Sequence, residues 1–174
     1  DGFDLVGCRN VLVEGVSIAG GGDDAMVLKS DFSVGRVLHS YNVTVRDCHL
    51  ASAGCNAMNF GSVTGGDFYD IAFQNITVTR AGKAGIGIVT MDGASIRNVS
   101  YRNITMSNTV TPIHMYIGAR QRAPVKKVGS ISGIHLVDVV ATHCGGGRNW
   151  AATLDGQPAD TGANVSVIYP IGPD

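Results

Sequence analysis

A short pattern recurs along this 174-residue chain and constrains its fold more than any other feature. Each copy begins with a turn-forming residue, continues through alternating apolar positions, passes a small residue and alternates again. The copies begin at Asn10, Asn42, Asp70, Asn98, Gly133 and Asn164. Successive copies therefore start 28 to 35 residues apart. A period of this length predicts a repeat architecture, in which each unit packs on its neighbours.

Within each copy, the alternation of apolar residues is typical of a strand that buries one face. The alternation shifts at a middle position that holds residues tolerant of the left-handed backbone conformation. These residues are Gly15, Asp47, Asn75, Asn103 and Asp138. We therefore expect a one-residue corner between two strands, with the corner side chains of successive copies stacked as a ladder.

A further short strand is predicted between the copies. Its segments cover residues 2–6, 25–29, 57–61, 85–89 and 112–116. Each repeat then holds three short strands, and the chain shows no amphipathic helix. A chain that returns to the same place with strands alone is a solenoid. The predicted fold class is all-β, a right-handed parallel β-helix of about five to six coils, with residues 1–174 in a single domain. The right-handed sense of the β-helix is assigned by analogy with known folds.

Composition and charge exclude several other classes of protein. The net charge is −1 and no basic run occurs, so we expect neither a nucleic-acid nor a membrane partner. No apolar run is long enough to span a membrane, and no signal-peptide pattern is present. The four cysteines form no Cys-x-x-Cys pair, which argues against a zinc site. Cys48 occupies an apolar position of the repeat and is predicted to be a core thiol.

Three carboxylates are expected to meet on one face of the solenoid. Asp1, Asp24 and Asn56 precede successive between-copy strands in register, and Asp23 lies next to Asp24. Equivalent positions of neighbouring coils are about 4.8 Å apart. Clustered carboxylates in an open groove suit glycosidic hydrolysis, because one carboxyl protonates the leaving oxygen while another activates water or attacks. The alternative for an Asp-Asp pair alone is a solvated turn.

Several outward-facing residues of the same face are candidates for substrate binding. They are Lys29, Asn56, Asn59, His114 and Tyr116. Lys29 suits a sugar hydroxyl or carboxylate, and the alternative is a solvated surface lysine. For His114 and Tyr116 the alternative is an ordinary exposed strand position. The basic loop 120–127 lies near the expected groove, where a solvated loop is the simpler interpretation.

The chain resembles glycoside hydrolase family 28, the polygalacturonase-type β-helix enzymes. The resemblance is carried by Asp1-Gly2, Gly22-Asp23-Asp24, Gly61-Ser62 and the repeats themselves. It implies that Asp23 is the general acid, that Asp1 and Asp24 activate the hydrolytic water, and that the anomeric configuration is inverted. We expect a pectin-like polysaccharide or oligosaccharide as partner, no cofactor or metal, a monomer, and secretion, which follows from the substrate class.

Two departures from the family pattern bear on the substrate. The family has Gly-His-Gly where this chain has Cys55-Asn56-Ala57, so Asn56 replaces the histidine. The family has Arg-Ile-Lys where this chain has 87–89, Gly-Ile-Val. Charge-assisted contacts contribute roughly 1.5–3 kcal/mol each, so their loss predicts weaker binding of a galacturonate unit. Either the substrate differs, or the activity is weak or lost.

Three other functions stay open at this point. They are a carbohydrate-binding β-helix without turnover, a polysaccharide lyase, and a purely structural solenoid. A lyase needs a base and a cation that stabilises the developing charge, and the sequence shows neither a calcium cluster nor the expected arginine. No capping segment is visible at either end, so we also expect a segment of a longer β-helix.

Overall fold

The computed structural model describes residues 1–145 and the strand at 165–168. Every paired strand is parallel to its partner, and the described residues contain no helix. The strands are β1 (Phe3–Val6), β2 (Arg9–Glu14), β3 (Ser17–Gly21), β4 (Met26–Ser30), β5 (Ser40–Ser52), β6 (Met58–Thr64), β7 (Phe68–Thr90), β8 (Ser95–Ser107), β9 (Thr109–Ile117), β10 (Ser130–Thr142) and β11 (Val165–Ile168). No helix in this part of the chain is therefore long and apolar enough to cross a membrane.

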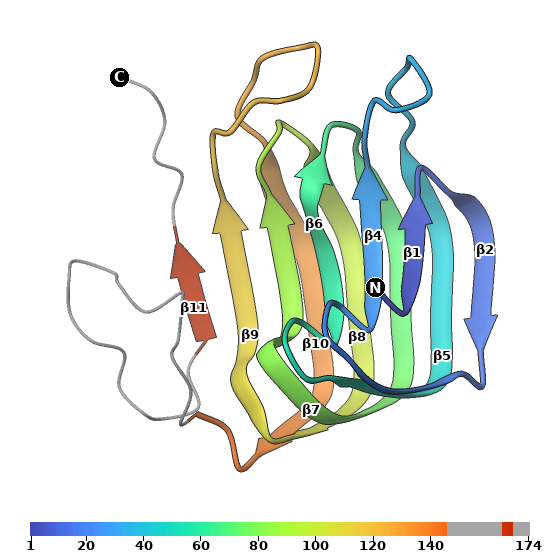
Figure 1. Cartoon of the computed structure of the whole chain (residues 1–174), viewed down its shortest axis with the longest axis vertical. Coiled ribbons are helices and arrows are strands. Elements are labelled where there is room, and N and C mark those ends of the chain that lie inside the picture. Colours follow the sequence, from blue (N-terminus) through green and yellow to red (C-terminus); the bar gives the residue numbers. More distant parts are fainter. Residues whose placement is uncertain (146–164, 169–174) are drawn as a thin grey trace.

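The strands form two faces of a solenoid. The front sheet runs β1, β4, β6, the C-terminal half of β7 and then β9, whereas the back sheet holds β2 and β3, β5, the first half of β7, β8 and β10. Figure 1 shows β1, β4, β6, the C-terminal half of β7 and β9 in this order at the front, with β5, β8 and β10 behind them. The predicted right-handed parallel β-helix is confirmed.

The number of coils and the last repeat differ from the prediction. The described residues make about four turns, fewer than the five to six expected, and most of the last repeat lies outside them. The pattern beginning at Asn164 predicted a back-sheet strand. Instead, β11 pairs with the front-sheet strand β9, with Val165 opposite Ile113. The placement of this last copy was therefore wrong.

The corner ladder of the back sheet is confirmed. All five predicted corner residues have positive φ, between 53° and 67°. Asn75 donates a hydrogen bond from Nδ2 to Asp47 Oδ1 at 2.9 Å, and Asn103 donates in the same way to Asn75 Oδ1 at 2.9 Å. These side-chain bonds link successive coils at the position where the backbone turns.

The interior of the solenoid is filled by the inward-facing residues of both sheets. Phe73 and Tyr101 stack in the core with ring centroids 4.8 Å apart, and Phe60 meets Phe68 edge to face at 5.5 Å. Cys48 is buried among them, as predicted, and all four cysteines are free. Burial of this apolar column between parallel coils fixes the register of the sheets.

Register places the candidate catalytic residues at one edge of the front sheet. Phe3 pairs with Met26, and Met26 pairs with Met58. One step earlier, Gly2 N–H donates to Asp24 C=O at 2.8 Å, and the next coils continue in the same way. Asp1, Asp24 and Asn56 therefore lie on neighbouring coils where the front strands begin.

Candidate active site

A cleft of about 660 Å³ runs across the front sheet, beginning at the edge where the aspartates lie. Strands β4, β6, β7 and β9 contribute lining residues, as do the segments before β1 and β4, and the segment after β9 supplies one end. The residues that line it are Asp1, Asp23, Asp24, Lys29, Cys55, Asn56, Asn59, Gly61, Ser62, Val63, Lys83, Val89, Met91, Tyr116 and Arg120. The cleft is thus polar near the aspartates and more apolar toward β9.

Asp24 is held firmly at the base of this cleft. Its Oδ1 accepts hydrogen bonds from the backbone N–H of Asn56 at 2.8 Å and from Asn56 Nδ2 at 2.7 Å. Its Oδ2 accepts a bond from Asn59 Nδ2 at 2.8 Å. The residue is only 6% exposed. Three N–H donors hold this buried carboxyl group in a fixed orientation.

Asp23 has the opposite environment, although it is the adjacent residue. Its side chain is 61% exposed and reaches into the cleft mouth. The backbone N–H of Asp24, which bonds Asp23 Oδ1 at 2.9 Å, and the thiol of Cys55 hold the pKa of Asp23 below its ordinary value. In the free protein, Asp23 is therefore ionised at neutral pH and protonates only in acid.

Asp1 lies beside these two residues and is paired with a lysine. Lys29 Nζ contacts Asp1 Oδ2 and also bonds Asp4 Oδ2 at 2.9 Å. The Asp1 side chain is 14% exposed and the Lys29 side chain 22%. Lys29 thus bridges two carboxylates of the first coil, and its positive charge is shared between them.

Cys55 and Lys83 stand next to the aspartate pair. Burial raises the pKa of the Cys55 thiol, which therefore stays protonated and bonds Asp23. Contact with Cys55 raises the pKa of Lys83, and the charges of Asp23 and Asp24 act in the same direction. A carboxylate oxygen of each aspartate and the Cys55 sulfur lie within 4.8 Å of one another. Lys83 brings a cation to this acidic cluster.

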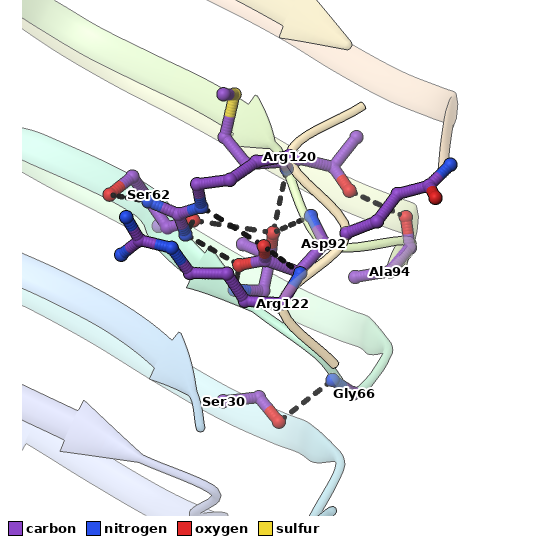
Figure 2. A network of polar contacts seen from close by, with 12 residues as sticks. Ser30, Ser62, Gly66, Asp92, Ala94, Arg120 and Arg122 are labelled. Carbon is purple, nitrogen blue, oxygen red and sulfur yellow. Dashed lines mark hydrogen bonds and ion pairs between the residues drawn. The ribbon is translucent and has the colours of Figure 1, made fainter. Parts of the chain in front are cut away.

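The segment after β9 closes the other end of the cleft. Arg120 bonds Asp92 through Nε at 3.0 Å and through Nη2 at 2.5 Å, and its Nη2 also donates to the Ser62 carbonyl at 2.6 Å. Burial raises the pKa of Asp92, but bonds from Arg120 and from the N–H groups of Arg122 and Thr64 outweigh it and leave that pKa below its ordinary value. Figure 2 shows the Arg120 side chain on Asp92, whereas Arg122 reaches Asp92 through its backbone N–H at 2.9 Å.

Of the remaining predicted binding residues, Asn56 and Asn59 support Asp24, whereas His114 and Tyr116 lie on β9. Asn56 and Asn59 are 7% and 5% exposed and bond Asp24, and Asn56 Oδ1 also accepts the N–H of Ala84 at 3.0 Å. His114 is 1% exposed, and burial lowers its pKa to about 4, so it is neutral at pH 7. Tyr116 lines the cleft and stacks on the His114 ring, with centroids 6.3 Å apart.

The family model for glycosyl hydrolases family 28 matches residues 1–160. This chain belongs to glycosyl hydrolase family 28. No curated protein shows a significant sequence match to it. The family consists of enzymes that cleave glycosidic bonds, which agrees with the clustered carboxylates in the cleft. The departures at Asn56, Gly87 and Val89 are therefore features of a divergent family member.

Sequence reasoning missed three polar residues of this family 28 site. Cys55 was read only as part of a changed motif, and Lys83 lies in a segment without a recognised pattern. Arg120 belongs to the loop for which a solvated surface was the simpler interpretation, yet it lines the cleft and bonds Asp92. The useful signal was Asp92, which follows the apolar strand segment 85–89 closely, because an acidic residue buried beside such a strand needs a partner.

Proposed function

We propose that this protein hydrolyses glycosidic bonds of a pectin-like polysaccharide with inversion of the anomeric configuration. The observation that carries the proposal is the contrast between neighbouring carboxyls in one cleft. Asp24 is buried and fixed by three N–H donors, whereas Asp23 is exposed at the cleft mouth. Two carboxyl groups in different environments can divide the acid and base roles between them. The same proposal places the protein outside the cell, as a monomer without a cofactor.

In this mechanism, Asp23 donates a proton to the leaving glycosidic oxygen. Its exposure lets a sugar reach it, and a bound substrate that excludes water would raise its pKa toward the working range. Asp24 and Asp1 hold the attacking water between neighbouring coils; one of them accepts its proton as the water oxygen bonds the anomeric carbon and the glycosidic bond breaks. Lys29 keeps Asp1 oriented by bridging it to Asp4.

We infer inversion of the anomeric configuration from the burial and hydrogen bonds of Asp24. Oxygens of Asp23 and Asp24 lie within 4.8 Å, which is closer to the roughly 5–5.5 Å of retaining enzymes than to the larger gap of inverting ones. However, a retaining enzyme needs a free carboxylate as nucleophile. Both oxygens of Asp24 are engaged by N–H donors, and the residue is almost fully buried. Asp24 is therefore better suited to orient water than to attack a sugar carbon.

The test is hydrolysis of a panel of pectic and neutral polysaccharides, followed as the release of reducing ends. We expect the Asp23→Asn variant to lose about 100- to 10,000-fold in kcat, which is the typical contribution of a general acid. Asp138→Asn is the matched control, because Asp138 lies at an exposed back-sheet corner where Asn also tolerates the positive φ. The control should keep full activity.

A specific observation favours one competing function, a carbohydrate-binding β-helix without turnover. The chain has no cation at 87 or 89 and no histidine at 56. If no polysaccharide is cleaved while the parent and Asp23→Asn proteins bind glycans equally, the binding function replaces the hydrolase. If cleavage persists in Asp23→Asn, the assignment of Asp23 as the acid is wrong.

A further inference from the structure

The end of the cleft nearest β9 carries three apolar or aromatic side chains beside Arg120 and Ser62. Val89 of β7 pairs with Tyr116 of β9, and both line the cleft together with Met91. A side chain placed on Gly118 would meet Met91 Sδ at 2.5 Å and Tyr116 Cε1 at 2.8 Å. These two side chains therefore close around Gly118. Val89, Met91 and Tyr116 form what we call the apolar end of the cleft.

Three cations line the cleft, and each has acidic groups of the protein beside it. Lys83 lies at the aspartate end, where Cys55, Asp23 and Asp24 act on it. Lys29 bridges Asp1 and Asp4, and Arg120 forms a two-bond pair with the buried Asp92. Arg120 also donates from Nη1 to Ser62 Oγ and from Nη2 to the Ser62 carbonyl. A sugar carboxylate beside Arg120 would meet an ion pair whose charge is already balanced, and so would gain little from it.

Position 87 has no room for a cation either. A Cβ on Gly87 would lie 2.5 Å from Asn59 Oδ1. The Asn59 amide cannot simply be turned over, because its Nδ2 donates to Asp24 Oδ2 at 2.8 Å and to Gly61 C=O at 3.2 Å. The amide that supports Asp24 thus occupies the space that a side chain at 87 would need.

We infer that the apolar end of the cleft binds an uncharged sugar unit, either a neutral pyranose or a methyl-esterified uronate, and discriminates against an ionised uronate. The inference rests on the proposed function and names the substrate class of the same site. The C–H face of a pyranose packs well on an aromatic ring and on Val and Met side chains. An ionised carboxylate placed there would lose hydration without gaining a partner.

The test measures binding separately from turnover. Asp23→Asn protein is titrated by calorimetry with three oligosaccharides of equal length: an oligogalacturonate, its fully methyl-esterified form, and a neutral galacto-oligosaccharide. We expect the ionised form to bind at least about tenfold more weakly than one of the two uncharged forms. Tighter binding of the ester identifies an esterified uronate as the preferred unit, and tighter binding of the neutral oligomer identifies a neutral sugar.

A second pair of variants locates the discrimination. Val89→Lys places a cation in the apolar end, whereas Val140→Lys places one on the exposed back sheet, where Val140 is 54% exposed. We expect Val89→Lys to raise the affinity for the ionised oligomer several-fold, in a salt-dependent manner, and Val140→Lys to leave it unchanged.

The possible failures are distinguishable. If the Asp23→Asn protein, with neither lysine substitution, binds the ionised oligomer most tightly of the three, the inference is wrong. The hydrolase proposal is then unaffected. An equal response to Val89→Lys and Val140→Lys overturns the inference as well. Absence of binding to all three oligomers, together with absence of cleavage of the whole panel, overturns the proposed function and the inference with it.

Discussion

At the scale of single residues, the two adjacent aspartates owe their different properties to their immediate contacts. Asp24 lies two residues before β4, and its carboxylate faces the amides of the next coil. Asp23 stays outside the sheet, bonded by the Asp24 N–H and by the Cys55 thiol. The division of roles between them therefore depends on Asn56, Asn59 and Cys55 as much as on the aspartates.

The contacts of Asp23 predict how activity depends on pH. Its pKa is lowered, so the proton needed by a general acid is lost as the pH rises, and kcat/KM should fall about tenfold per pH unit on the alkaline side. Cys55→Ala removes one of the donors that lower this pKa. The variant should shift the alkaline limb of the kcat/KM profile to higher pH.

The matched control for that profile is Cys8→Ala, because Cys8 is also a free, partly exposed thiol but does not line the cleft. Cys8→Ala should leave the alkaline limb of the kcat/KM profile at the same pH as in the parent protein. An unchanged limb in Cys55→Ala would mean that Asp23 does not supply the proton, and that another group titrates in the profile.

At the scale of the strands, the front sheet couples two positions of neighbouring coils. Asn59 of β6 pairs with Gly87 of β7, and the absence of a side chain on Gly87 makes room for the Asn59 amide. In this chain, the amide at 59 therefore requires a residue without a side chain at 87. Restoring an arginine at 87 alone would push away a support of Asp24.

This coupling predicts the effect of Gly87→Ala. The added Cβ forces Asn59 to move, so we expect a loss of about 1–3 kcal/mol in the free energy of unfolding and a fall in kcat. Chemical denaturation and initial rates measure the two effects. Gly21→Ala is the control, since nothing lies within 4 Å of its added Cβ and its φ is not positive.

A double variant separates packing from positioning. Adding Asn59→Ala to Gly87→Ala relieves the contact and should restore most of the stability, but not kcat, because the donor to Asp24 Oδ2 is lost. Recovery of kcat along with stability would show that Asn59 is not needed to position Asp24.

Much of this strand-scale organisation could be predicted from the sequence, because the repeat carries it. The period fixed which strands pair, and the corner residues such as Asn75 stood at positions that need positive φ. Contacts between loops and the cleft were not predictable in the same way. The bond between Arg120 and Asp92 joins residues 28 apart, but neither lies on the repeated pattern. Likewise, the burial of His114 depends on its neighbours rather than on alternation along β9.

At the scale of the whole molecule, the solenoid determines where the chemistry lies. Parallel stacking brings Asp1, Asp24 and Asn56 from three coils to one sheet edge, as expected from their spacing in the sequence. The cleft then extends across the later coils toward Tyr116. Residues 1–160 match the family as one stretch, which agrees with a site assembled from successive coils rather than from one loop.

The most direct test of the account is the anomeric configuration of the first sugar that the protein releases, read by proton NMR during hydrolysis of a substrate chosen from the panel. Because Asp24 is buried and held by three N–H donors, only one of which bonds Oδ2, we expect it to activate water rather than to attack the sugar, so the released sugar should have the inverted configuration. Retention of configuration would show a covalent intermediate on a carboxylate. A product with a new double bond would show a lyase, and either result would contradict the mechanism proposed for these aspartates.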